Sequence, residues 1–287
     1  METVSVLTVE EAQSILEDRN VVAVGARGDE ERRRRHGTKT TFARVFEIHA
    51  DAVPGALPQG ASAGEIRIVG KPSSVAAAIA SAKQARAIAG NTPVAGFSLN
   101  DLLELAGGSL ASLTDLSARL AAAGLQLVAE TPIDILASAA DAIRAARDGG
   151  LQVLRLTVQH DDPASRLRLL GLARDVQDAV GGIRAFAPLP RVTSIAQPTT
   201  GYDDVRQIAV ARLLVHNIDS IQVDWALYGP KLAQVALTMG ADDVDGVSPL
   251  GGDLGRRRSP LEEIRGNITA AGLEPLERDG LFEQKVG

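Results

Sequence analysis

The segment Gly201–Gly246 constrains the fold more than any other part of the sequence. It reads as one helix–strand–helix–strand unit with little irregular chain between its elements. Asp203 and Asp204 suit the start of a helix, because carboxylates interact favourably with the free N–H groups there. A strand is expected over 220–225 and a second helix over 231–239. Strands and helices that alternate over short connections predict a parallel sheet.

The same alternation continues through the rest of the chain. Strands are expected over 40–49, 65–69, 92–97, 125–130, 151–159, 183–188 and 220–225, and from 246 onward. Eight strands with intervening helices predict a (β/α)8 TIM-type barrel. The alternative is a doubly wound open sheet, which usually carries a GxGxxG fingerprint after its first strand. Here the first strand ends in EIHADAVPG, so the barrel is favoured.

One barrel domain is expected to span residues 1–287, with N-terminal helices in 1–37, the barrel in 38–250, and a loop and helix in 251–287. A chain of this length with 45% hydrophobic residues can bury such a core. The net charge of −6 gives no support for nucleic-acid binding, and no apolar run reaches the ~20 residues of a membrane span. The acidic N-terminus lacks a signal-peptide pattern, which predicts a cytoplasmic protein.

Catalytic groups of a barrel lie at the C-terminal ends of its strands. Four side chains at such positions could act as general acids or bases: His49, Glu47, Glu130 and His160. Other polar or aromatic residues at strand ends could hold a small-molecule ligand at the barrel mouth: Lys71, Asn100, Gln159, Arg191, Gln222, Asp224 and Trp225. Histidines and carboxylates that converge could also bind a divalent metal, but no metal ligands are assigned.

Each candidate also has a structural alternative. His49 and His160 could only cap loops, and Glu130 could pair with Arg155 or Arg191 across the barrel.

Three further features also have both a functional and a structural explanation. Trp225, the only tryptophan, is more often part of a core or pocket wall than a catalyst. The run Arg32–Arg35 could clamp an anion, but such runs more often form a solvated helix end. The loop Gly251–Gly255, followed by Arg256–Arg258, could hold a phosphate.

The stretch AVARLLVHNIDSIQVDWALYGPKLAQVALTMGADDVDG resembles the C-terminal half of the menaquinone-pathway radical SAM enzymes. These are aminofutalosine synthase and dehypoxanthine futalosine cyclase, and the deazaflavin FO synthase subunits are more distant kin. Weaker similarities occur in LTVEEAQSILE with RRRRHGTKTTF, in GEIRIVG, and in VQDAVGGIRAFAPL. Their order and spacing match, so the resemblance covers nearly the full length. It implies a radical-SAM-like barrel in the context of menaquinone biosynthesis.

The sequence departs from that family at its reaction centre. The family places CxxxCxxC just after strand one to hold a [4Fe–4S] cluster, whereas this sequence has a shorter loop beginning with His49–Gly55 and contains no cysteine. Thiolate ligation of that cluster is therefore excluded, and no cofactor is expected. After strand two, KPSS stands where the family usually has a second glycine and a histidine-containing loop. After strand eight, Ser248–Gly252 stands where the family tends to carry paired glutamates.

Two hypotheses follow. The protein could be a non-catalytic partner or regulatory subunit that docks on a cysteine-bearing paralog in menaquinone biosynthesis. Alternatively, it could be a repurposed enzyme that performs acid–base or lyase chemistry on a futalosine-like or related metabolite. A barrel that binds a ligand without converting it is a third possibility. The partner hypothesis is narrowly favoured, because catalytic residues are lost while the helix–strand unit is retained.

Overall fold

A computed structural model describes residues 8–160, 162, 164–192, 201–251 and 259–285. Apart from Gly251, the expected phosphate loop lies outside these residues. The strands are β1 (Lys39–His49), β2 (Glu65–Val69), β3 (Val94–Ser98), β4 (Leu127–Glu130), β5 (Arg155–His160), β6 (Ala185–Val192), β7 (Ser220–Asp224), β8 (Asp243–Val247) and β9 (Glu274–Arg278). The helices are α1 (Val9–Glu17), α2 (Val21–His36), α3 (Val75–Ala89), α4 (Leu99–Leu105), α5 (Leu110–Ala122), α6 (Ala139–Asp148), α7 (Arg166–Val180), α8 (Gly201–Leu214), α9 (Trp225–Leu237) and α10 (Pro260–Ala270).

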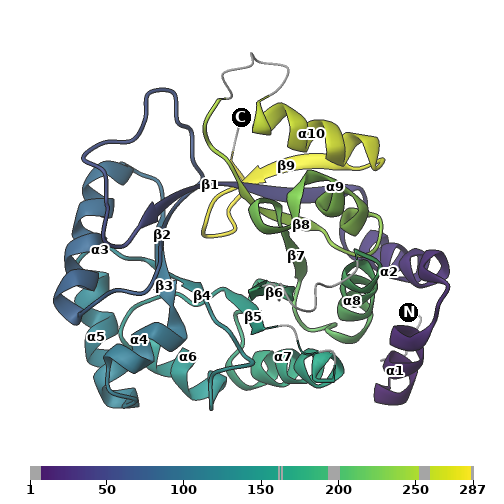
Figure 1. The fold of residues 1–287 in the computed structure, drawn as a ribbon, viewed down its shortest axis with the longest axis horizontal. Coiled ribbons are helices and arrows are strands. Elements are labelled where there is room, and N and C mark those ends of the chain that lie inside the picture. Colours follow the sequence, from purple (N-terminus) through teal and green to yellow (C-terminus); the bar gives the residue numbers. More distant parts are fainter. Residues whose placement is uncertain (1–7, 161, 163, 193–200, 252–258, 286–287) are drawn as a thin grey trace.

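Strands β1 to β8 form a parallel sheet in the order β4-β3-β2-β1-β8-β7-β6-β5. Its two ends, β4 and β5, are joined by short parallel bridges at Leu127–Gln152 and Pro132–Thr157. The sheet therefore curves into a nearly closed barrel, with helices around its outside (Figure 1). The expected (β/α)8 TIM-type fold is confirmed. Among the described helices, none is long and apolar enough to cross a membrane.

The segment that organises the sequence forms the expected unit, with one boundary shifted. Strand β7 ends at Asp224, whose side chain accepts a 2.9 Å hydrogen bond from the backbone N–H of Leu227. This cap starts α9 at Trp225, six residues before the helix predicted from position 231. Gly229, with φ of 76°, and Pro230 produce a kink inside α9 rather than a loop before it.

The chain does not pass directly from β4 into a helix. After β4 ends at Glu130, α6 begins only at Ala139. The carboxylate of Asp134 accepts hydrogen bonds from the backbone N–H groups of Gln159 and His160, at 2.7 and 2.9 Å. Residues before α6 therefore form a turn that holds the end of β5, which competes with helix formation.

Strand β9 was missed by the sequence analysis, which expected only a loop and a helix after residue 250. Its residues pair in parallel with Lys39–Ala43 of β1, while β2 pairs with the second half of β1 (Figure 1). The tail that follows β9 places Leu281 against Ala95 and Ala129 of the barrel wall. The C-terminal segment thus contributes to the end of the barrel opposite the mouth.

The arginine run at the end of α2 is paired with acids of its own helix. Arg32 and Arg33 contact Asp29, at 3.0 and 2.7 Å, and Arg34 and Arg35 contact Glu31, at 2.7 and 2.6 Å. The hydrogen bond from Arg34, opposed by partial burial and aided by Arg35, lowers the pKa of Glu31 to about 2.

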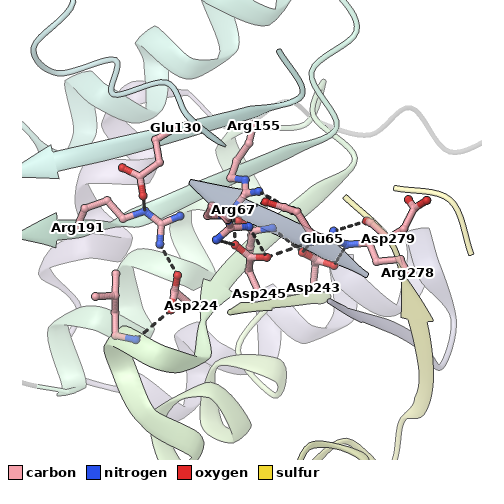
Figure 2. A network of polar contacts seen from close by, with 12 residues as sticks. Glu65, Arg67, Glu130, Arg155, Arg191, Asp224, Asp243, Asp245, Arg278 and Asp279 are labelled. Carbon is pink, nitrogen blue, oxygen red and sulfur yellow. Dashed lines mark hydrogen bonds and ion pairs between the residues drawn. The ribbon is translucent and has the colours of Figure 1, made fainter. Parts of the chain in front are cut away.

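The barrel interior contains an ionic network instead of a purely apolar core (Figure 2). Arg278 of β9 donates two 2.6 Å hydrogen bonds to the carboxylate of Asp243. Asp245, two residues further along β8, contacts both Arg67 and Arg155. Burial alone would raise the pKa of Asp245, but Arg155, Arg67 and Arg278 outweigh this and hold it well below its usual range. Buried charges of this kind are tolerated only when they are paired.

Replacing Arg278 with methionine should strongly destabilise the barrel. The change would leave the buried carboxylate of Asp243 without its main cation, which typically costs about 3–5 kcal/mol. Urea unfolding would measure the loss. The matched control is Arg265→Met, because Arg265 is half-exposed and its nearest acid, Glu262, lies 3.8 Å away. The control should change the free energy of unfolding by about 1 kcal/mol or less. Equal losses for the two variants would contradict the central role of Arg278.

Candidate functional site

A cavity of about 200 Å³ opens at the C-terminal ends of β2 to β5. The apolar part of its wall is formed by Ile68, Val69, Phe97, Ala129 and Ile135, together with Gly70. The polar part is formed by Arg67, Lys71, Ser98, Asn100, Asp101, Glu130 and Gln159. Four residues that the sequence predicted at the mouth, Lys71, Asn100, Glu130 and Gln159, line this one cavity.

Phe97 stands where β3 passes into α4 and adopts a φ of 63°. Such a backbone conformation is strained for a bulky side chain and is concentrated at functional sites. Phe97 is buried and forms part of the cavity wall. Sequence inspection missed this residue, because nothing in the string VAGFSLN distinguishes it from an ordinary apolar strand residue.

Arg191, at the end of β6, lies between two carboxylates (Figure 2). Its Nη1 donates a 2.7 Å hydrogen bond to Asp224, and its Nε lies 3.3 Å from Glu130. Among the described residues, the second terminal nitrogen, Nη2, has no hydrogen-bond partner, although the side chain is only 6% exposed. Glu130 thus pairs with Arg191, as one structural alternative proposed, and it also lines the cavity.

Glu47 lies on β1 in register with Arg67, which lines the cavity. Its side chain is exposed to solvent, and neighbouring protein atoms still desolvate part of the carboxyl group. This desolvation raises the pKa of Glu47; Asp224 and Asp245 add to the increase, and Arg67 and Arg191 oppose it. Within the described part of the chain, no direct hydrogen bond or ion pair holds the carboxyl group. A carboxyl with a raised pKa and free oxygens is suited to exchange a proton with a ligand.

Lys71 and Asp101 carry the charges on the opposite wall of the cavity. The ammonium group of Lys71 is hydrogen-bonded to Glu104, which raises the pKa of Lys71 and keeps it charged. Asn100 donates a 2.8 Å hydrogen bond to the same Glu104. Burial raises the pKa of Asp101; Lys71, 4.0 Å away, opposes this, and Glu104 and Glu130 add to it. Asp101 was read from the sequence only as a charge in the first helical turn, so its place in the cavity was missed.

The other predicted residues do not line the cavity. His49 is exposed at the rim, where its Nδ1 is hydrogen-bonded to Asp51. His160 is exposed and lies 3.6 Å from Asp134. Gln222 is buried within the barrel and donates a 2.6 Å hydrogen bond to Asp243.

Trp225 is likewise buried in the hydrophobic core. Glu47, Arg191 and Asp224 are not among the lining residues either. The catalytic and ligand-binding roles assigned to all of the predicted site residues stay predictions. Over the described ranges, no three histidine, aspartate or glutamate side chains form a group suited to a metal ion.

Some known proteins resemble part of the chain in sequence, and others share its fold. The family described as "CofH/MqnC C-terminal region" matches residues 184–285. The 5-amino-6-(D-ribitylamino)uracil–L-tyrosine 4-hydroxyphenyl transferase of Archaeoglobus fulgidus is 36% identical over 130 residues, which cover 41% of this chain and 38% of that protein. Aminodeoxyfutalosine synthase of Thermus thermophilus is 36% identical over 134 residues, which cover 42% and 36%. The match thus spans well under half of either relative.

Two solved structures share the fold over most of the chain. Methylornithine synthase superposes with a TM-score of 0.62 at 12% identity and covers 94% of both chains. The FeFe-hydrogenase maturase HydG from Carboxydothermus hydrogenoformans gives 0.67 at 10% identity, over 96% of this chain and 77% of that one. The expected resemblance to the futalosine-pathway radical SAM enzymes is confirmed. Its extension to the N-terminal segments stays a prediction.

The residues present do not fit the iron–sulfur cluster that this resemblance implies. The sequence has no cysteine to supply thiolate ligands. Directly after β1, where the family carries its cysteines, the polar side chains are His49 and Asp51, and they are hydrogen-bonded to each other.

Replacing Glu47 with glutamine should stabilise the protein at high pH. A carboxyl whose pKa is raised above the usual 4.5 stabilises the fold below that pH, and this contribution is lost as the pH rises through the raised value. Glutamine does not ionise, so Glu47→Gln should exceed the wild type in melting temperature at pH 8 and converge with it near pH 4.

Glu31→Gln is the control of opposite sign, because the pKa of Glu31 is lowered to about 2. That variant should be less stable than the wild type at pH 8, and the gap should close as the pH falls from 4.5 toward 2. A Glu47→Gln variant that behaves like Glu31→Gln would contradict the raised pKa of Glu47.

Proposed function

We propose that this protein is a cluster-free barrel that binds and converts a small metabolite by acid–base chemistry at its mouth. The metabolite would be related to those handled by the menaquinone-pathway enzymes that the chain resembles. The observation that carries this proposal is the carboxyl of Glu47. This group lies beside the cavity, has a raised pKa, and has no direct hydrogen bond or ion pair with a described residue. General acid–base catalysis needs a group of this kind, with a pKa shifted toward the working pH.

The surrounding residues support binding as well as proton transfer. Arg191 has a buried N–H group available for an oxygen of the ligand, and Glu130 and Asp224 hold its guanidinium in place. Apolar walls formed by Phe97 and Ile135 can exclude water from the ligand body. A volume of about 200 Å³ lies below the roughly 300–1,000 Å³ of usual ligand pockets, which indicates a small molecule.

A metabolite extract from the source organism would test the proposal. The wild type should retain a small molecule through ultrafiltration and convert it over time, as followed by mass spectrometry. Glu47→Gln should retain the molecule but convert it at least about 100-fold more slowly, the usual contribution of a general base. Glu263→Gln, a change at an exposed glutamate of α10, is the matched control and should behave as the wild type.

Retention without conversion by the wild type would contradict acid–base catalysis and favour a ligand-binding barrel. Equal conversion by wild type and Glu47→Gln would remove Glu47 from the chemistry.

A role as a partner subunit is the second candidate, and exposed apolar side chains favour it. Tyr202 in the first turn of α8 is 70% exposed, and Leu227 in the first turn of α9 is 50% exposed. Val192, at the end of β6, is also exposed. These positions follow the C-terminal ends of neighbouring strands, so they lie on the mouth side of the barrel. Exposed apolar residues that gather in one region often mark a protein interface.

Co-expression with a cysteine-bearing paralog from the same genome would test this role. We expect stoichiometric co-purification that the double change Tyr202→Ser and Leu227→Ser reduces at least ten-fold. Val22→Ser is the control, because Val22 is 77% exposed but lies on α2. No co-purification, or equal loss for both variants, would contradict a partner interface at the mouth.

A further inference from the structure

The barrel contains two layers of charge. In the lower layer, three cations (Arg67, Arg155 and Arg278) meet three carboxylates (Glu65, Asp243 and Asp245). At the mouth, Asp101 and Glu130 line the cavity together with two cations, Arg67 and Lys71. Both cations are hydrogen-bonded to carboxylates outside the lining, Arg67 to Glu65 and Asp245 and Lys71 to Glu104. Within the described part of the chain, no cation is hydrogen-bonded to Asp101 or Glu130.

The resident cations do not compensate the carboxylates of the cavity wall. Lys71 is hydrogen-bonded to Glu104 and remains 4.0 Å from Asp101. Asp101 accordingly keeps a raised pKa, to which its burial contributes first and Glu104 and Glu130 also contribute. A positive charge placed in the cavity would relieve this repulsion.

Arg191 gives an independent indication of a ligand. Its side chain is 94% buried, and within the described part of the chain its Nη2 has no hydrogen-bond partner. Figure 2 shows this nitrogen directed toward Arg67. Buried donors normally have partners, so an oxygen of a ligand or of water is expected there. Asp224 and Glu130 already supply two negative charges to Arg191. A third carboxylate would be repelled, so a neutral acceptor such as a carbonyl oxygen fits best.

We propose that the mouth selects a small protonated amine that also carries a neutral hydrogen-bond acceptor. The ammonium group lies between Asp101 and Glu130, which both line the cavity. The acceptor takes the free N–H of Arg191, and the apolar body of the ligand lies against Phe97 and Ile135. This inference rests on the proposed function, because it names the substrate class of the same site.

Three probes of nearly equal size test the charge preference: cyclohexylmethylamine, cyclohexanecarboxamide and cyclohexanecarboxylate. Dissociation constants would be measured by ligand-observed NMR on the full chain. The amine should bind at least about ten-fold more tightly than the carboxylate, with the amide between them. Affinity for the amine should increase as the pH rises through the raised pKa values of Asp101 and Glu47, because both carboxyl groups then become negatively charged.

Variants identify the site of binding. Asp101→Asn should remove most of the preference for the amine over the carboxylate, whereas Glu263→Gln should preserve it. Unchanged preference in Asp101→Asn would overturn the placement of the ammonium group.

The outcomes separate this inference from the proposed function. Equal or tighter binding of the carboxylate would overturn the amine preference but would not contradict the proposed function. Failure of all three probes, together with retention of a metabolite from the extract, would likewise overturn only the amine preference. Failure of the probes and of the extract would overturn both.

Discussion

The carboxylate of Asp245 is the interaction on which the barrel depends most. Arg67 of β2 and Arg155 of β5 contact it from strands on opposite sides of β8, and Arg278 of β9 lies 3.9 Å away. These contacts join strands that do not pair with one another. They also compensate for the thin connection between β4 and β5, where only short bridges close the barrel. Removing any one charge would leave the remaining buried charges unbalanced, so the network ties the two halves of the chain together.

The ionic network of the interior also acts on the carboxyl of Glu47 above it. Desolvation raises the pKa of Glu47, and the carboxylates of Asp224 and Asp245 add to the increase. Arg67 and Arg191 oppose the increase without cancelling it. Arg67 is at the same time paired with Glu65 and Asp245. The charges that stabilise the barrel interior therefore also influence the proton affinity of a carboxyl at its mouth.

The sequence predicted the barrel and several residues of its mouth, because both follow from local patterns. Strand ends of a parallel barrel meet on one side, which brought Glu130 and Gln159 to one cavity. Non-local features could not be read in this way. The string EPLER looks like a polar loop, and it becomes β9 only because β1 offers a free edge and Asp243 binds Arg278. The β2 sequence alternates between charged and apolar residues, and such alternation ordinarily marks the charged face as exposed, so it did not indicate that Arg67 points into the barrel.

The region after β1 shows that this mouth is a consistent structure without a cluster. Ser81 donates a hydrogen bond to the carbonyl of Ala50, and the backbone N–H of Ser62 bonds to Pro249 across the rim at 3.2 Å. Val53 and Leu57 pack against the core from the same loop. A segment that satisfies its own polar groups and buries apolar side chains is stable as it stands. The loop after β1 is therefore held in place by its own contacts. Near the end of that strand, the carboxyl of Glu47 has no direct hydrogen bond or ion pair within the described part of the chain, so its pKa follows its desolvation and the surrounding charges.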